Sequence, residues 1–332
     1  MKKGHHHWKR SAATSLALMV LLSSIASVSI LLYPDNNQAE AVIRFDGMKN
    51  LSTNSGTSLD PNVSTSGNNV YVVWSDNTPG NNEIILRAST DGGATFSSES
   101  KGRLTNTISA SLSPKVSSSG THVYVVWIEK DNSEKSDVHF RGSYNSGSGF
   151  GDIKNISNTG AASEAQIAAS GNNIYVVWSD AKFGNSDIYF SSSSNGGQSF
   201  GTPVNLSDNA GISDQPQIVA TVDGHVYVVW QDSISGSKEI LLRASDNFGI
   251  EFDSINNLSN NDGSSSNPEL AASESSVYVT WTDNTAGNVE VFFAASTNAG
   301  SSFGSAVNLS NTVGTSYRAQ IAASGDKVYV TW

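Results

Sequence analysis

The chain of 332 residues carries 19 Lys and Arg against 30 Asp and Glu, contains no cysteine, and is 37% hydrophobic. A net charge of −11 repels nucleic acid and anionic lipid surfaces, so neither is an expected partner. Without cysteine no disulfide can form, so the fold depends on its hydrophobic core.

The first 41 residues resemble a targeting segment. Basic residues between positions 2 and 10 precede an uncharged run over residues 12–32, and Ala39-Glu40-Ala41 has the small-x-small pattern of a cleavage site. The uncharged run is also long enough to span a bilayer. A signal peptide cleaved after Ala41 and an uncleaved N-terminal anchor therefore both remain open, and the anchor is the one membrane contact we expect. Both interpretations predict a secreted or cell-surface protein outside the cytoplasm.

Residues 42–332 contain a repeat with a period of about 51 residues. The most regular part of the repeat is a pentapeptide such as Val70-Tyr-Val-Val-Trp74. The six repeated tryptophans, 51 to 53 residues apart, are Trp74, Trp127, Trp178, Trp230, Trp281 and Trp332. A period near fifty indicates one supersecondary unit copied in tandem.

Each repeat contains four short segments rich in β-branched and aromatic residues, bounded by Gly, Asn, Asp and Ser. In the tryptophan pentapeptide both alternating faces are apolar, which indicates a strand covered on both sides by other sheets. Four-stranded antiparallel sheets stacked in this way are the blades of a β-propeller, wound into a closed ring. We therefore predict an all-β propeller of about six blades.

The blade count leaves two alternatives. Five blades are complete between Leu59 and Ser310. The sixth either is closed by residues 43–52 pairing with residues 317–332, or belongs to a chain that once continued beyond Trp332. A chain that ends on a core tryptophan favours the second alternative.

An octapeptide recurs between the third and fourth strands, first as Ser89-Thr-Asp91-Gly-Gly93-Ala-Thr95-Phe96. Asp or Asn accepts hydrogen bonds from turn amides, Gly supplies a positive φ, and the aromatic residue packs beneath the turn. The equivalent Asn-x-Gly-x-x-Phe positions are Asn145, Gly147 and Phe150; Asn195, Gly197 and Phe200; Asn247, Gly249 and Phe252; and Asn298, Gly300 and Phe303.

These octapeptides resemble the Asp box of bacterial neuraminidase repeats, Ser-x-Asp-x-Gly-x-Thr-aromatic, although four of the five carry Asn for Asp and all carry Phe for Trp. The resemblance implies an Asp-box propeller of the sialidase-like superfamily, in which the boxes are structural and lie away from the active site. Sialidases use three arginines, a tyrosine with an acidic partner, and an aspartate. Their Arg-Ile-Pro motif is missing here. Tyr317 and Arg318 are the best catalytic candidates that the chain offers.

Arg87, Arg141 and Arg243 do not fit the arginine triad, because they occupy one repeat position on different blades. We expect each to pair with an acid of a neighbouring blade. Loops on a rigid ring are the usual place for recognition, so we predict a ligand-binding rim at the axial face. Its residues are Asp60, Glu164, Asp214, Tyr317 and Arg318.

Second strands end in an acid and third strands begin with one. Two such carboxylates plus loop carbonyls could hold Ca²⁺. Alternatively, one acid caps the loop and the other pairs with a basic residue of the adjacent blade, which the repetition in every blade favours. Apart from this possible Ca²⁺, no cofactor is expected. The candidate pairs are Asp76 with Glu83, Glu129 with Asp137, Asp180 with Asp187, Asp232 with Glu239, and Asp283 with Glu290.

The sequence thus predicts a binding module for an extracellular glycan or protein, without catalysis. An exo-α-sialidase-type glycoside hydrolase and a passive surface or adhesion scaffold are the alternatives.

Overall fold

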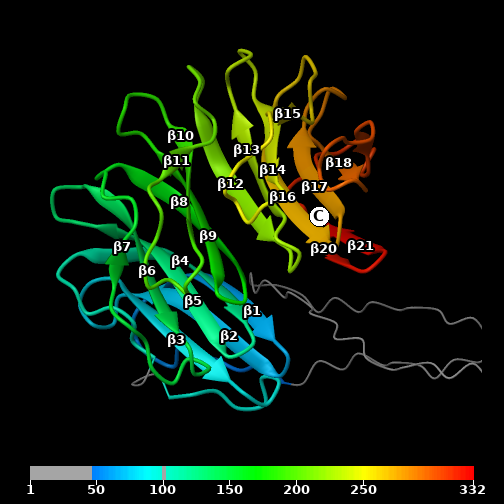
Figure 1. The fold of residues 1–332 in the computed structure, drawn as a ribbon. Coiled ribbons are helices and arrows are strands. Elements are labelled where there is room, and N and C mark those ends of the chain that lie inside the picture. Colours follow the sequence, from blue (N-terminus) through cyan, green and yellow to red (C-terminus); the bar gives the residue numbers. More distant parts are fainter. Residues whose placement is uncertain (1–46, 99–101) are drawn as a thin grey trace, which may run out of the picture.

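The computed structural model describes residues 47–98 and 102–332, and all regular elements in this part of the chain are β-strands. The strands form six sheets in which neighbours along the chain are also antiparallel neighbours in space (Figure 1). The leader predicted for residues 1–41 lies outside the described residues. Within them, no helix is long and apolar enough to cross a membrane.

The sheets follow the predicted repeat. The first contains β1 (Ser58–Ser66), β2 (Asn69–Asp76) and β3 (Glu83–Ser89), and an antiparallel bridge between Ile85 and Arg103 stands at the place of its fourth strand. The next four sheets have four strands each and the sixth has two. Their strands are β4 (Ala110–Ser119), β5 (His122–Lys130), β6 (Ser136–Ser143) and β7 (Lys154–Asn155); β8 (Ala162–Ser170), β9 (Asn173–Asp180), β10 (Asp187–Ser193) and β11 (Val204–Asn205); β12 (Ser213–Ala220), β13 (Val226–Asp232), β14 (Glu239–Ser245) and β15 (Asn256–Asn257); β16 (Ser265–Ser273), β17 (Ser276–Asp283), β18 (Glu290–Ser296) and β19 (Val307–Asn308); β20 (Gln320–Ser324) and β21 (Lys327–Thr331).

The first strands of the sheets form an inner wall. β1, β4, β8, β12, β16 and β20 pack against one another in this order, and the remaining strands of each sheet fan outward (Figure 1). This arrangement is that of propeller blades around an axis, so the predicted all-β propeller is confirmed.

The second strand of each blade is buried on both faces, as its apolar pattern predicts. In β5, Val123, Val125 and Trp127 pack on the first blade, whereas Tyr124 and Val126 pack on the third. Trp127, Trp178, Trp230 and Trp281 are fully buried in this way. Each blade therefore supplies half of two successive cores, and no blade can bury its apolar residues alone.

The described sheets do not close into a ring, which was one of the two alternatives that the sequence left open for the sixth blade. β1 and the β20–β21 sheet stand at the two ends of the series (Figure 1), and their extensive contacts with other inner strands are to β4 and β16 respectively. One side of the sixth sheet is therefore uncovered, and the exposure of one repeat position shows this. Tyr329 is 51% exposed where its counterpart Tyr175 is 1% exposed, because no described blade covers that side of the sixth sheet. Trp332 is also 55% exposed.

Residues 49–51 form no regular strand, yet they contact the first blade as an outer strand contacts the blade that follows it. Arg87 Nη1 donates to the carbonyl of Leu51, as Arg243 Nη1 donates to Leu206 at 3.1 Å. Lys49 Nζ donates to the Gly93 carbonyl at 3.1 Å, at the position where Asn256 Nδ2 reaches Gly300. This segment thus occupies the place of an outer strand preceding the first blade. Of the predicted closing segment 43–52, residues 43–46 lie outside the described range.

The octapeptide turns have the predicted internal hydrogen bonds. In the first, Ser89 Oγ accepts from the Gly93 amide at 2.8 Å, and Asp91 Oδ1 accepts from the Thr95 amide at 2.8 Å. The turn glycines lie close to the preceding blade. A Cβ at Gly197 would stand 2.4 Å from the Phe140 ring, at a φ of +84°. These turns therefore join consecutive blades as well as third and fourth strands.

The equivalent tyrosines test the packing. We expect Tyr175→Ala to lower the free energy of unfolding by about 3–5 kcal/mol, because it opens a cavity between two blades. Tyr329→Ala, at the same repeat position on the open face, should cost less than about 1 kcal/mol. Tyr175→Phe should be close to neutral, since the Tyr175 hydroxyl is buried without a partner among the described residues. Urea denaturation followed by tryptophan fluorescence measures all three, and equal losses for the two alanine variants would contradict the assigned packing.

Candidate functional site

Every blade carries an irregularity near the beginning of its first strand. The pairing between first and second strands shifts register there in the first five blades, as between Ser163 and Gln166 of β8. One non-glycine residue per blade has a positive φ at this bulge, including Arg318 just before β20: Asp60, Ser113, Glu164, Gln215, Asn267 and Arg318. Left-handed backbone in non-glycine residues costs free energy and is concentrated at functional sites. The bulges direct polar side chains away from the regular pleat.

Two residues after each bulge position stands a second polar residue, and a Pro or an Ala precedes it in all six blades. This series comprises Asn62, Lys115, Gln166, Gln217, Glu269 and Gln320. The members of the two series on the second to fifth blades line a depression of about 320 Å³ where the beginnings of β4, β8, β12 and β16 converge. Ala165, Pro216 and Pro268 complete its wall.

Some of these polar groups join one blade to the next. Glu164 Oε2 accepts from the Gln215 amide at 2.7 Å and from Ser179 Oγ at 3.0 Å. Asn62 Oδ1 accepts from the Val116 amide at 3.0 Å, and Gln320 Nε2 donates to Glu269 Oε1 at 3.0 Å. The contacts to Gln215 and Val116 satisfy backbone N–H groups at or near the bulges, whereas Gln320 and Glu269 are joined through their side chains.

Other side chains in the depression have no such role. Lys115, Gln166 and Gln217 are half-buried on three consecutive blades, and their side chains make no hydrogen bond or ion pair among the described residues. Half-buried donors without a protein partner need water or a ligand. These three side chains are therefore the groups best placed to bind a ligand.

Glu269 lies in the same depression with a perturbed acidity. Burial raises the pKa of its carboxyl to about 7, although the hydrogen bond from Gln320 and the positive charge of Lys115 both lower it. The carboxyl therefore exchanges its proton near neutral pH, and it can donate a hydrogen bond below this pH and accept one above it.

The predicted rim residues are only partly brought together. Glu164 lines the depression, and Asp60 and Arg318 occupy equivalent bulge positions on the first and last blades. Asp214 stands one residue before the bulge of β12, 4.0 Å from Lys238 Nζ, and Tyr317 is 58% exposed beside Arg318. The sequence prediction omitted Lys115, Gln166, Gln217 and Glu269. The signal that could have found them is the polar residue that follows a Pro or an Ala at one repeat position of every first strand.

The repeated acids hold the loops that pass from blade to blade. Asp283 and Glu290 stand opposite each other in register, as predicted for a hairpin, but they bind different loops. Asp283 Oδ2 accepts from Trp281 Nε1 at 3.4 Å and from Ser265 Oγ at 2.7 Å, on the entry side of its blade. Glu290 accepts from Ser310 and from the Thr312 amide, on the exit side.

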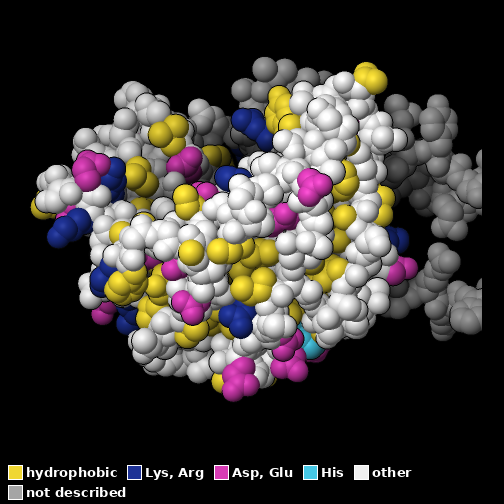
Figure 2. Space-filling view, turned by 90° about the horizontal axis from the view of Figure 1, so that it is seen from above, with side chains coloured by type: hydrophobic (Ala, Val, Ile, Leu, Met, Phe, Trp, Pro, Cys, Tyr) yellow, Lys and Arg dark blue, Asp and Glu magenta, His cyan; other side chains and the backbone are white. Residues whose placement is uncertain are grey.

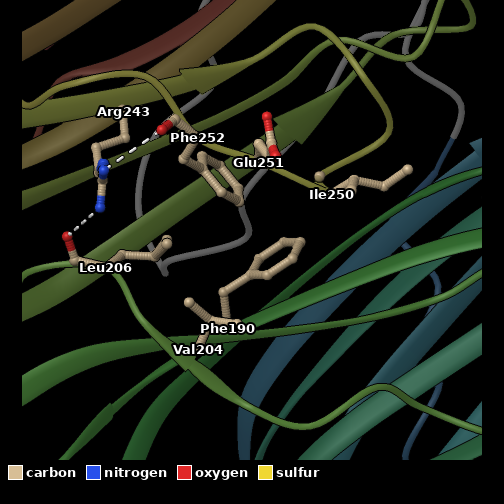
Figure 3. A pocket seen from close by; sticks show the side chains of 8 residues that line it. Phe190, Val204, Leu206, Arg243, Ile250, Glu251 and Phe252 are labelled. Atoms are coloured by element: carbon tan, nitrogen blue, oxygen red, sulfur yellow. Dashed lines mark hydrogen bonds between the residues drawn. The ribbon is translucent and has the colours of Figure 1, made fainter.

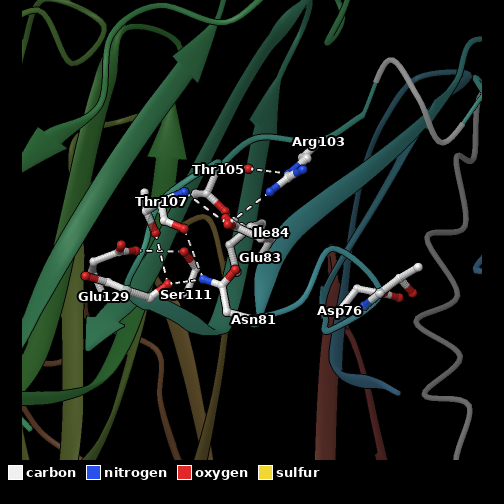
Figure 4. Close-up of polar contacts among 11 residues, drawn as sticks. Asp76, Asn81, Glu83, Ile84, Arg103, Thr105, Thr107, Ser111 and Glu129 are labelled. Atoms are coloured by element: carbon white, nitrogen blue, oxygen red, sulfur yellow. Dashed lines mark hydrogen bonds and ion pairs between the residues drawn. The ribbon is translucent and has the colours of Figure 1, made fainter. Parts of the chain in front are cut away.

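Figure 4 shows both halves of this arrangement around one crossover loop. Glu83 Oε1 accepts from Arg103 Nη2 at 3.1 Å and from the Thr107 amide at 3.0 Å. At the other end of the loop, Ser111 Oγ donates to Glu129 Oε2 at 2.7 Å. Among the described residues no group of three or more His, Cys, Asp or Glu side chains could hold a metal ion. The repeated carboxylates all accept hydrogen bonds from protein groups. Binding of Ca²⁺ to them stays a prediction.

These carboxylates predict acid sensitivity. Burial raises the pKa of Asp283, but hydrogen bonds from Thr285, Ser265 and Asn261 outweigh it and hold the pKa below its ordinary value. Because the pKa is lower in the folded state, the ionised group stabilises the fold above the unfolded pKa of about 3.9, and this stabilisation is lost as the pH falls further.

We expect Asp283→Asn to lower the free energy of unfolding by about 1–3 kcal/mol at pH 7 and by progressively less between pH 4 and pH 2. Urea denaturation across this pH range measures the difference from the parent protein. Asp326→Asn, in the exposed turn between β20 and β21, is the control and should have no effect. A loss at Asp283 that is the same at every pH would exclude the carboxylate as its cause.

The three repeated arginines lie on the outer side of the blades. Arg243 Nε donates to the Asp253 carbonyl at 2.6 Å. Its Nη1 donates to the carbonyl of Leu206 in the preceding blade, and its Nη2 donates to the Phe252 carbonyl (Figure 3). Arg87 and Arg141 make the equivalent contacts. Their neighbouring-blade partners are thus backbone carbonyls, and the predicted acid partners were wrong. A groove of about 350 Å³ beside Arg243 is lined by Phe190, Phe252 and Ile250 and belongs to the packing between two blades.

Charged side chains of both signs are scattered over the face that Figure 2 shows. Figure 2 shows a face dominated by uncharged polar side chains and backbone, with acidic and basic side chains interspersed.

No protein-family model and no curated protein matches the chain. Solved structures do resemble it. An α-L-arabinanase from Penicillium chrysogenum, in complex with arabinobiose, has a TM-score of 0.54 at 15% identity, over 80% of this chain and 84% of that one. The α-L-arabinofuranosidase Arb93A from Fusarium graminearum, with an iminosugar inhibitor, gives 0.53 at 12% identity, over 80% and 84%. The endosialidase of phage phi92 gives 0.54 at 10% identity, over 83% and 61%. These neighbours are carbohydrate-active β-propellers, and at such identities they establish the fold.

Proposed function

We propose that this protein is an exported or cell-surface β-propeller of the Asp-box type that binds carbohydrate in the depression at the centre of its inner wall. The observation that carries the proposal is the set of half-buried, unpartnered side chains of Lys115, Gln166 and Gln217. Amide and ammonium groups suit sugar hydroxyls, which both donate and accept hydrogen bonds. Export is supported by the order of segments within residues 1–41, in which a basic segment is followed by an uncharged run and then by a small-x-small cleavage pattern.

Two further features support the proposal. Structural neighbours include enzymes solved with arabinobiose and with an iminosugar, so the fold accommodates carbohydrate ligands elsewhere. The octapeptide turns, which resemble Asp boxes, lie at the end of the blades opposite the bulges. In the third blade, for example, the backbone N–H of Gly196 donates to the carbonyl of Asn172 in the turn between β8 and β9. The depression is thus free of the turns that join the blades.

A glycoside hydrolase is the second candidate. The observation in its favour is that two carboxyl groups, Glu164 and Glu269, line one depression, as general acid–base chemistry on a glycosidic bond requires. The sialidase type receives less support, because Arg87, Arg141 and Arg243 are engaged with backbone carbonyls on the outer side of three blades. Product analysis after incubation with any oligosaccharide that binds would separate binding from hydrolysis.

The binding proposal is tested with a glycan array followed by calorimetry on the best ligand. We expect the double variant Gln166→Ala, Gln217→Ala to bind about 5- to 150-fold more weakly, since two hydrogen bonds are worth about 1–3 kcal/mol together. Gln198→Ala, on an exposed octapeptide turn at the other end of its blade, is the matched control and should bind normally. Undiminished affinity in the double variant, or no glycan bound at all, would reject the assignment.

A further inference from the structure

Charge in the central depression is distributed in a way that neutral sugar binding does not explain. The chain carries a net charge of −11, yet a lysine without an ion-pair partner among the described residues lines its central depression. Lys115 comes from β4 and Glu269 from β16, on opposite sides of the depression, and the charge of Lys115 acts on the Glu269 carboxyl. Between them β8 and β12 contribute the amides of Gln166 and Gln217.

The other charged groups around Glu269 are few. Glu164 faces the depression from β8, but its Oε2 is occupied by the Gln215 amide and Ser179 Oγ. β12 brings Asp214, whose neighbouring cation is Lys238. Arg318 precedes β20, which packs against β16, and Asp60 lies on β1. On β17 the residue paired with Glu269 is Thr280, which is uncharged. Lys115 is therefore the cation that lines the depression together with Glu269.

We infer that the depression is specific for an acidic sugar, a uronate, whose carboxylate forms an ion pair with Lys115 and accepts a hydrogen bond from the protonated carboxyl of Glu269. This inference rests on the proposed carbohydrate binding and names its ligand class. The amides of Gln166 and Gln217 supply two further donors between the charged groups. A set of donors around one point suits an anionic acceptor, because each hydrogen bond to an ionised group is stronger than its neutral counterpart.

Binding of the ligand carboxylate in this way is coupled to protonation of Glu269. Glu269 can donate only while it holds its proton, and its pKa is raised to about 7, so ligand binding takes up a proton at neutral pH. With binding confined to the protonated form, the dissociation constant is nearly constant below pH 6 and about tenfold higher at pH 8 than at pH 6. Above pH 7 the ionised Glu269 repels the ligand carboxylate.

Calorimetry with three oligosaccharides of one backbone tests the inference on the full chain: one bearing glucuronate, one bearing a sulfate ester in its place, and one neutral. We expect the glucuronate compound to bind at least tenfold more tightly than the neutral one at pH 6. Its affinity should fall about tenfold by pH 8, and repeat titrations in buffers of different ionisation enthalpy should show proton uptake.

Variants separate the two groups. Lys115→Met should remove the preference for glucuronate, because it weakens binding of the glucuronate compound at least tenfold more than binding of the neutral compound, and Lys154→Met on the outer strand β7 is its control. Glu269→Gln keeps a donor without a titrating proton, so the pH dependence should vanish, whereas Glu251→Gln on the outer groove should preserve it.

The outcomes separate this inference from the proposal beneath it. Equal affinity for neutral and glucuronate compounds, with no effect of Lys115→Met, would refute the acidic-sugar assignment and leave carbohydrate binding standing. Preference for the sulfate ester without proton uptake would refute the role of the Glu269 proton. Failure of all three compounds to bind at any pH, together with an empty glycan array, would refute both.

Discussion

Burial of each central strand between two neighbouring sheets is the constraint on which the rest of the structure depends. In β9, Ile174, Val176 and Trp178 face the preceding blade, whereas Tyr175 and Val177 face the following one. A sheet with apolar residues on both faces cannot be stable in water by itself, so its neighbours are part of its stability. The blade order, the inner wall of first strands and the outward fan of the others all follow from this stacking.

Apolar contacts between the sheets alone would not define the path of the loop that leads from one blade to the next. Hydrogen bonds from buried polar groups define this path. Each crossover loop is held at both ends by carboxylates that belong to different blades, as Glu83 and Glu129 do for the loop containing Thr107. The second-strand acid also accepts a hydrogen bond from the indole two residues earlier, so the core tryptophan and the loop share one partner. Repetition of the same carboxylate in every blade is thus explained by architecture, without any ligand.

The inner wall departs from regular geometry where the polar depression forms. A bulge with positive φ at a residue such as Glu164 or Gln215 is costly, and glycine would relieve it. Side chains that reach into the depression or across to the next blade stand there instead. The chemistry of the repeat also varies at this point: the position held by Gln in three blades carries Asn62, Lys115 and Glu269 in the others. A conserved backbone with changing side chains is suited to recognition of an asymmetric ligand.

Local sequence was sufficient for the secondary structure, the repeat, the blade order and the octapeptide turns, because strand pattern and turn chemistry operate over a few residues.

The site was predicted only in part. Glu164 could be placed near the axis from its repeat position, but Lys115 and Glu269 stand 154 residues apart and meet only when four blades are stacked. The acidity of Glu269 and the partners of Arg87, Arg141 and Arg243 likewise depend on atoms from other blades. The sequence left open whether the sixth blade closes the ring, because closure depends on how the blades pack and the sequence pattern of a single blade does not encode it. The sequence by itself therefore determined what each blade is; the tertiary structure decided which side chains converge at the axis, because desolvation and charge act through space between residues distant in the chain.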